Sequence, residues 1–196
     1  MSRTGNVVSI VCLALGIALI LLAVGAIGYT VIGQNAATER NERIISSFFD
    51  TVPEISDGFI YERSDYHMPT LQLEGVDVIG IVEVPQLSAK LPVCASWDKM
   101  EASLIPSRLS GSVYDSSLVI GGADSKGQLD FFEEICVGDT VFFTDVTGDR
   151  FEYIVSSIDV IKNVPTGELI EENDDLLMFA KDAYTSKYTV LHLKLK

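Results

Sequence analysis

The chain opens with one long hydrophobic stretch and continues as short hydrophobic runs separated by turn residues. Residues 7–33 carry no charged side chain and consist mostly of Leu, Ile, Val, Ala and Gly. As a helix, this stretch would be about 40 Å long, which exceeds the roughly 30 Å hydrocarbon core of a bilayer. The core of a secretory signal is shorter, about 7–15 residues, and ends in a cleavage site. We therefore expect an uncleaved transmembrane helix at 7–33, after a short tail at 1–6.

The next segment, 34–69, is expected to form an amphipathic helix and a connector. Within 38–49, large apolar residues recur at helical spacing: Ile44, Ile45, Phe48 and Phe49. This apolar face is expected to pack on the following domain rather than on a membrane surface. Residues 50–68 are expected to be a connector with one short extended piece at 59–61.

From residue 70 to 196 the pattern predicts a mainly β domain. Short runs rich in β-branched and aromatic residues predict strands at 76–84, 90–95, 118–120, 140–144, 151–161, 176–180 and 188–195. The last run alternates with period two, which is typical of a strand with one buried face. The expected helical pieces are too short for crossovers between parallel strands and lie at 96–103, 129–135 and 166–172. We expect a closed or nearly closed, antiparallel-rich β-barrel with short helices.

The charge balance narrows the possible partners. The chain has 28 acidic and 14 basic residues, a formal net charge of −14. Such a surface repels phosphate backbones, so we expect no nucleic-acid partner. Of the three cysteines, Cys12 lies in the hydrophobic stretch, whereas Cys94 and Cys136 are expected to be buried apolar side chains. The sequence also allows a disulfide between Cys94 and Cys136. No cofactor is expected.

Several segments of the domain share an order and spacing with one known family. They lie at 80–85, 91–97, 106–112, 118–122 and 137–143, and are followed by the stretch 176–190. In this order they resemble sortases, the membrane-anchored cysteine transpeptidases of bacterial surfaces. The resemblance covers about 70–196 and implies a sortase-like β-barrel. It also implies a single-pass protein of the cell membrane of a Gram-positive-type bacterium, with the C-terminal domain outside the cytoplasm.

The residues that carry sortase chemistry are replaced at each matching position. The resemblance places Ala123 at the catalytic histidine, Lys181 at the catalytic cysteine and Lys187 at the arginine. Gln128 falls where many members carry a second histidine. A lysine amine is mostly protonated near neutral pH and is then no nucleophile, and alanine cannot transfer a proton. We therefore expect no catalytic residues, and a pseudo-sortase that binds a peptide or protein partner at the cell envelope.

Alternatives remain open for the residual groove, which is expected to contain Asp124, Ser125, Lys181, Asp182 and Lys187. One hypothesis is that Lys181 forms an ion pair with Asp124 in place of the lost thiolate–imidazolium pair. The alternative function is an active transpeptidase or hydrolase in which Lys181 works with Asp124 or Ser125. A third is an anchored structural subunit whose barrel provides a protein interface.

Three further groups of residues have candidate roles. The acidic run before the 176–180 strand offers a weak calcium site at Glu171, Glu172, Asp174 and Asp175, although a solvated run is the simpler interpretation. His67 falls in the connector, and His192 is expected at an outward or rim position. Four aromatic residues either line a peptide groove or pack in the barrel: Trp97, Tyr114, Tyr184 and Tyr188.

Overall fold

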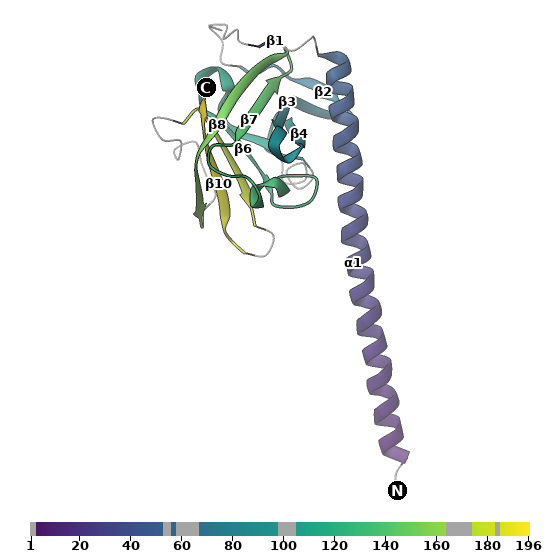
Figure 1. Ribbon diagram of the computed structural model, residues 1–196. Helices are drawn as coiled ribbons and strands as arrows, with labels where there is room; N and C mark the ends of the chain where they lie inside the picture. Colours follow the sequence, from purple (N-terminus) through teal and green to yellow (C-terminus); the bar gives the residue numbers. More distant parts are fainter. Residues whose placement is uncertain (1–2, 53–55, 58–66, 98–104, 164–173, 183–184) are drawn as a thin grey trace. The chain divides into compact units, whose positions relative to one another are not determined.

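The computed structural model describes residues 3–52, 56–57, 67–97, 105–163, 174–182 and 185–196 (Figure 1). Side chains are described for all of these except 3–11, 27–34 and 56–57. The chain divides into two compact units, residues 1–36 and residues 37–196. Helix α1, Arg3–Thr51, begins in the first unit and ends in the second.

In the first unit, α1 exposes apolar side chains in every direction. The four consecutive residues Leu19, Ile20, Leu21 and Leu22 are between 62% and 71% exposed. Successive helical residues point about 100° apart, so these four side chains cover all sides of the helix. Among the residues whose side chains are described, no helix has both the length and the hydrophobicity that a bilayer crossing requires.

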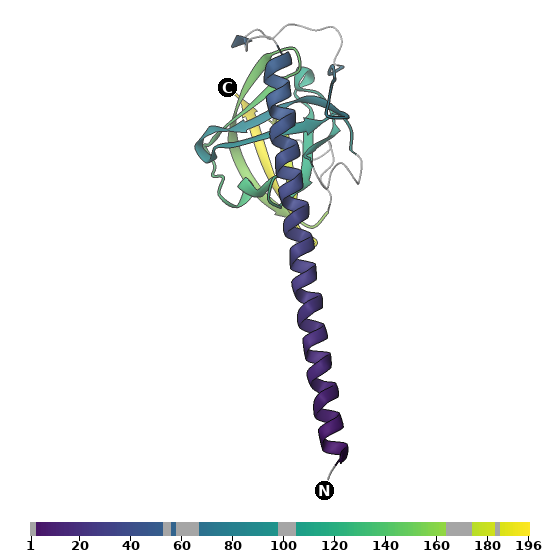
Figure 2. The same cartoon turned by 90° about the vertical axis from the view of Figure 1, so that its right-hand side faces the viewer.

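In the second unit, the end of α1 packs on the sheet through one apolar face. Ile44 and Phe48 are fully buried in a cluster, named here the helix-side core, whose other members are Leu73, Val76, Val78, Ile81, Cys94 and Ile105. Figure 2 shows this part of α1, in blue, against the teal strands. Ile44 and Phe48, which recur at helical spacing in the sequence, thus lie on the face of α1 that contacts the sheet. The extended piece predicted at 59–61 lies outside the described residues.

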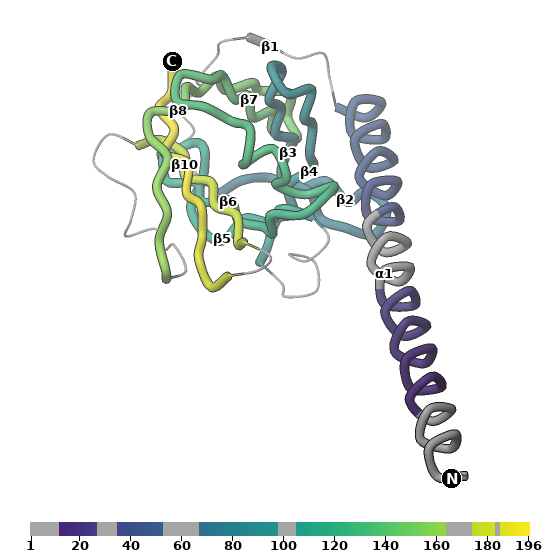
Figure 3. Tube along the Cα trace, turned by 60° about the horizontal axis from the view of Figure 1, so that its bottom comes forward, coloured from purple at the N-terminus to yellow at the C-terminus, as the bar shows by residue number. Residues whose placement is uncertain are grey.

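Eight strands close a barrel (Figures 1 and 3). In order around the ring they are β3 (Val76–Val84), β4 (Ala89–Cys94), β5 (Ser107–Ser110), β6 (Leu118–Ala123), β9 (Leu176–Lys181), β10 (Tyr188–Leu195), β8 (Asp149–Ile161) and β7 (Thr140–Asp145). Strand β7 then pairs with β3 and completes the ring. The pairs β4–β5 and β6–β9 are parallel and the other six are antiparallel.

Shorter elements decorate the barrel. Strand β1 (Ser56–Asp57) pairs with β8, and β2 (Leu71–Leu73) pairs with β3. Within the described ranges, short 3₁₀ helices are η1 (Pro85–Leu87), η2 (Val113–Asp115) and η3 (Asp130–Glu133). The predicted mainly β, closed barrel with short helices is confirmed, and η3 lies within the helical piece expected at 129–135. The piece predicted at 166–172, and most of the one at 96–103, lie outside the described residues.

Alternation along β6 and β9 separates the barrel interior from an outer face. Leu118, Ile120, Met178 and Ala180 belong to the interior core. Residues of the opposite parity form a second apolar group, named here the outer cluster: Val119, Leu177, Phe179 and Val190. Phe179 of the outer cluster therefore lies on the outer face next to the ends of β6 and β9.

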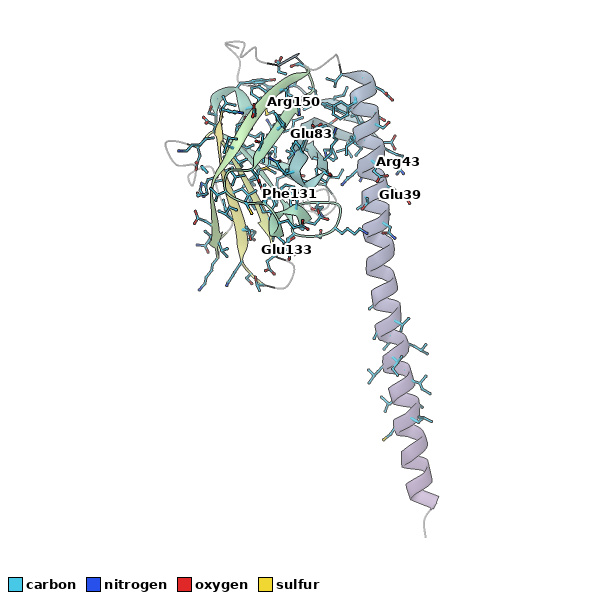
Figure 4. All side chains as sticks on the ribbon, in the orientation of Figure 1. Glu39, Arg43, Glu83, Phe131, Glu133 and Arg150 are labelled. Carbon is cyan, nitrogen blue, oxygen red and sulfur yellow. The ribbon has the colours of Figure 1, made fainter. Side chains whose placement is uncertain are left out.

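Elsewhere on the barrel, a charged network joins three strands (Figure 4). Glu83 of β3 forms ion pairs with Arg150 of β8 at 3.2 Å and with Lys90 of β4 at 2.7 Å. The guanidinium of Arg150 lies over the ring of Phe142, 3.9 Å from its centroid. Because the Glu83 side chain is only 12% exposed, this network is better shielded from solvent than an ordinary surface pair.

Candidate functional site

The structure brings together the ends of β6 and β9 and the start of β10. Ala123 is the direct register partner of Lys181 across the parallel pair β6–β9. Lys181 is also the partner of Tyr188, which follows Lys187. Backbone bonds continue beyond the strands, because the Asp124 amide donates to the Lys181 carbonyl at 2.9 Å and the Asp182 amide donates to the Lys187 carbonyl at 3.1 Å. We name this region, Ala123–Ser125 with Lys181, Asp182 and Lys187, the strand-end site.

An aromatic cluster lies next to the strand-end site on the outer face. The ring of Phe179 contacts Trp97 at a centroid distance of 5.7 Å and Tyr188 at 6.0 Å. Trp97 is 38% exposed, so part of its indole faces solvent. Of the other expected aromatic residues, Tyr114 packs on Phe151 away from this cluster, and Tyr184 lies outside the described residues.

The loop that follows β6 is held closely to the strand end. Gln128 is buried, and its Oε1 accepts a hydrogen bond from the Ala123 amide at 3.2 Å. The Leu129 amide donates to the Ala123 carbonyl at 3.2 Å, and the Gln128 amide donates to the Ser125 carbonyl at 2.9 Å. Gln128 therefore acts as a structural acceptor that fixes the backbone of Ala123.

Burial and then acidic neighbours, rather than Lys181, determine the direction in which the pKa of Asp124 shifts. Its pKa is raised above the ordinary value by partial burial first, and then by repulsion from Glu133, Asp182 and Asp130. Between these described residues, there is no ion pair from Asp124 to Lys181 and no side-chain hydrogen bond from Ser125 to Lys181. The hypothesised Asp124–Lys181 ion pair is thus absent, because Lys181 is exposed whereas Asp124 lies among the acids of the following loop.

Comparison with solved structures identifies the architecture. Sortase A from Corynebacterium diphtheriae is 19% identical with a TM-score of 0.55, and the match covers 83% of this chain and 84% of that one. Streptococcus pneumoniae Sortase C is 16% identical with a TM-score of 0.54, covering 82% and 88%. Sortase A from Listeria monocytogenes is 16% identical with a TM-score of 0.53, covering 61% and 87%. The chain has the sortase fold. No protein-family model and no curated protein matches the sequence.

The thiols of this sortase-fold chain lie away from the strand-end site. Cys94 is fully buried in the helix-side core, and Cys136 is exposed, with its Sγ 3.6 Å from the Glu134 carbonyl oxygen. Both are present as thiols, so the allowed disulfide is not formed, and the expectation that Cys136 is buried is wrong because it precedes β7 in an exposed turn. In the described part of the chain, no thiol faces an imidazole at the ends of β6 and β9.

His192 lies on the outward face of β10 but is buried there. It is buried, and its Nδ1 lies 2.5 Å from Oδ2 of Asp174, while its Nε2 lies 3.3 Å from Oδ2 of Asp159. The sequence did not predict this burial, in which the buried carboxylate of Asp174 supplies the partner that the imidazole needs. The sequence does indicate the face on which His192 lies. His192 is two residues from Val190 of the outer cluster, and residues two apart on a strand share a face.

The two described members of the expected calcium site already have roles in the fold. Asp174 contacts His192, and Oδ2 of Asp175 accepts a hydrogen bond from the Leu195 amide at 2.7 Å. Glu171 and Glu172 lie outside the described residues. His67 is exposed just before β2, in a different part of the chain from the strand-end site.

Proposed function

We propose that this sortase-fold protein binds a peptide or a surface protein at the cell envelope of a Gram-positive-type bacterium and does not catalyse transpeptidation. The observation that carries the proposal is the pairing of Ala123 with Lys181 across β6 and β9. The resemblance assigns these two adjacent positions to the histidine and the cysteine of a sortase. The fold thus keeps the two positions adjacent, while neither side chain has the required chemistry.

Acyl transfer of the sortase type has two halves, and each of them needs a reactive side chain. A sortase-type reaction needs a thiolate to attack the peptide carbonyl and an acid to protonate the leaving amine. Lys181 presents an exposed amine where that thiolate is needed, and among the described residues it forms no ion pair with a carboxylate. Attack by lysine would also form an amide, which has no easy second step. Ala123 has no proton to transfer.

The surroundings of the strand-end site suit binding. Trp97 exposes part of its indole on top of Phe179, and aromatic side chains supply much of the binding energy at protein interfaces. Lys181 and Lys187 are exposed beside this cluster. An extended peptide would place apolar side chains against the aromatic cluster and a carboxylate or backbone carbonyls near the lysines.

The binding test uses the single tryptophan of the chain, Trp97, as its reporter. The full chain in detergent is titrated with sorting-signal peptides of the kind that sortases process, and a saturable change in Trp97 emission is expected. Lys181→Ala and Lys187→Ala should weaken binding, whereas Lys194→Ala, which removes an exposed lysine at the other end of β10, should not. Mass spectrometry should find neither cleaved peptide nor a covalent adduct.

Other outcomes separate the alternatives. A peptide adduct or cleavage that disappears in Lys181→Ala would replace the proposal with an active enzyme in which Lys181 works with Asp124 or Ser125. Absence of both binding and adduct, with co-purification of another envelope protein, would favour a structural subunit instead.

Residues 7–33 are proposed to anchor the protein as a single membrane span, with the C-terminal domain outside the cytoplasm. The support is the exposure of Leu19, Ile20, Leu21 and Leu22 on all sides of α1, since a helix that is apolar all round is normally buried. Membranes from cells that produce the full chain are washed with alkaline carbonate. Retention in the membrane pellet is expected, and release into the wash would contradict the anchor.

A further inference from the structure

The end of helix α1 holds the loop that follows β6. We propose that Asn41 of α1 is a positioning residue for the strand-end site, acting through Gly127 and Gln128 of that loop. The contact itself does not depend on the proposed function, whereas its effect on ligand affinity does.

The first step is the contact between α1 and the loop. Asn41 is 3% exposed, and its Nδ2 donates a hydrogen bond to the Gly127 carbonyl oxygen at 2.5 Å. Gly127 has a φ of +81°, a conformation that favours glycine. A Cβ at this position would lie 2.8 Å from Oγ1 of Thr38. The loop therefore approaches α1 so closely that a larger residue would have to displace it.

The second step leads from Gly127 to the strand end. The next residue, Gln128, accepts a hydrogen bond from the Ala123 amide, and Leu129 donates one to the Ala123 carbonyl. Both polar groups of the Ala123 backbone are thus held by the two residues that follow Gly127. A displacement of Gly127 changes these two bonds directly, and Ala123 is the register partner of Lys181.

The contact between Asn41 and Gly127 borders a cleft. This cleft of about 230 Å³ is lined by Thr38, Asn41, Glu42 and Ile45 of α1, by Lys126, Gly127 and Asp130 of the loop, and by residues 88–91. Close contact between α1 and the loop is therefore limited to the neighbourhood of Thr38, Asn41 and Gly127. In addition, Oδ1 of Asn41 is buried without a hydrogen-bond partner, which costs stability. An apolar side chain would avoid that cost, so stability alone does not account for the amide.

The decisive variant is Asn41→Leu in the full chain, which keeps the branch at Cγ, extends into the adjoining cleft, and removes both the donor and the unpartnered acceptor. The thermal midpoint is expected to stay the same or rise, because the unpartnered acceptor is lost together with one hydrogen bond. The backbone amide signals of Ala123 and Asp124 in ¹⁵N spectra are expected to move without any ligand. The affinity for the sorting-signal peptide is expected to fall about fivefold or more.

The matched control is Ile44→Val, three residues further along α1 in the helix-side core. It should lower the thermal midpoint while leaving the two amide signals and the affinity unchanged, since it removes packing and not the loop contact. Gly127→Ala perturbs the same contact from the loop side. It should move the same amide signals even if its stability falls.

Each outcome decides the proposal. Unmoved Ala123 and Asp124 signals in both Asn41→Leu and Gly127→Ala would overturn it, as would an unchanged peptide affinity in Asn41→Leu where the wild type binds. If the signals move but the wild type binds no peptide, the positioning role stands and the proposed function fails.

Discussion

The ring of Phe179 lies over Gly121, in the space where any other residue would place its Cβ. The two residues are register partners across β6 and β9. A Cβ built on Gly121 would lie only 2.1 Å from Cζ of Phe179. The missing side chain leaves room for the distal end of the ring, and Trp97 packs on that ring beside the strand-end site.

Gly121→Ala is expected to destabilise the barrel by about 2–3 kcal/mol, because a rigid ring must leave its place in a packed cluster. Urea unfolding measures the loss, and Trp97 emission should change with it. The control is Gly122→Ala, whose Cβ points to the opposite face and meets the flexible end of Leu129 at 3.0 Å. That variant should cost less than about 1 kcal/mol. Equal costs would refute the role given to the Phe179 ring.

His192→Ala is expected to destabilise the domain by about 3 kcal/mol, because the Asp174 side chain, only 4% exposed, would lose the imidazole that it contacts. The matched variant is Asp159→Asn, at the other ring nitrogen, where the carboxylate is 61% exposed. An exposed pair contributes about 0–1 kcal/mol, so this variant should be nearly neutral. Chemical denaturation of both variants is the measurement, and a reversed order of the two losses would contradict the buried His192–Asp174 contact.

The sequence predicted those strands that have a run of apolar, β-branched or aromatic residues of their own. Strand β3 has the bounds expected from its β-branched residues and from the proline that follows it. Strand β5 was not expected, because its residues 107–110, Ser-Arg-Leu-Ser, have no apolar run. It forms through non-local contacts, including the hydrogen bond from Nε of Arg108 to the Ala95 carbonyl at 2.8 Å.

The contrast between local patterns and non-local contacts also explains which features of the strand-end site the sequence predicted. Ala123 and Lys181 are adjacent because they are register partners across β6 and β9. The sequence indicated this pairing through the resemblance, which assigns the two positions to the catalytic histidine and cysteine of sortases. Strand register does not give the direction in which a side chain points. The opposite charges of Asp124 and Lys181 therefore suggested an ion pair that the structure lacks. The His192–Asp174 contact joins residues 18 positions apart, across a segment whose pattern carried no signal for it.

Asp124→Asn is expected to stabilise the domain slightly at neutral pH. Burial and then Glu133, Asp182 and Asp130 raise the pKa of Asp124, so the folded state holds its proton to a higher pH than the unfolded chain does. Stability is therefore lost as the pH rises through this range, and the carboxylate is unfavourable above it. The gain should stay below about 1 kcal/mol because solvent screens the site.

The pH dependence provides the check on that gain. The difference between Asp124→Asn and the wild type should disappear below the ordinary range of an aspartate, where both side chains are neutral, and should shrink at high salt. Asp77→Asn, which removes an equal charge from an exposed position on β3, is the control for the change in net charge. A stabilisation of Asp124→Asn that persists unchanged at low pH would contradict the buried, repelled carboxylate as its cause.

The native cysteines provide a test of the proposed orientation without engineered labels. Cys136 is exposed, Cys94 is fully buried, and Cys12 lies in the apolar stretch of α1. A membrane-impermeant maleimide applied to intact cells should label the wild type once, and Cys136→Ser should abolish that label. Cys94 should react only after denaturation, because its thiol lies in the helix-side core. Labelling that appears only after the cells are lysed would place the domain in the cytoplasm and remove the cell surface from the proposed function.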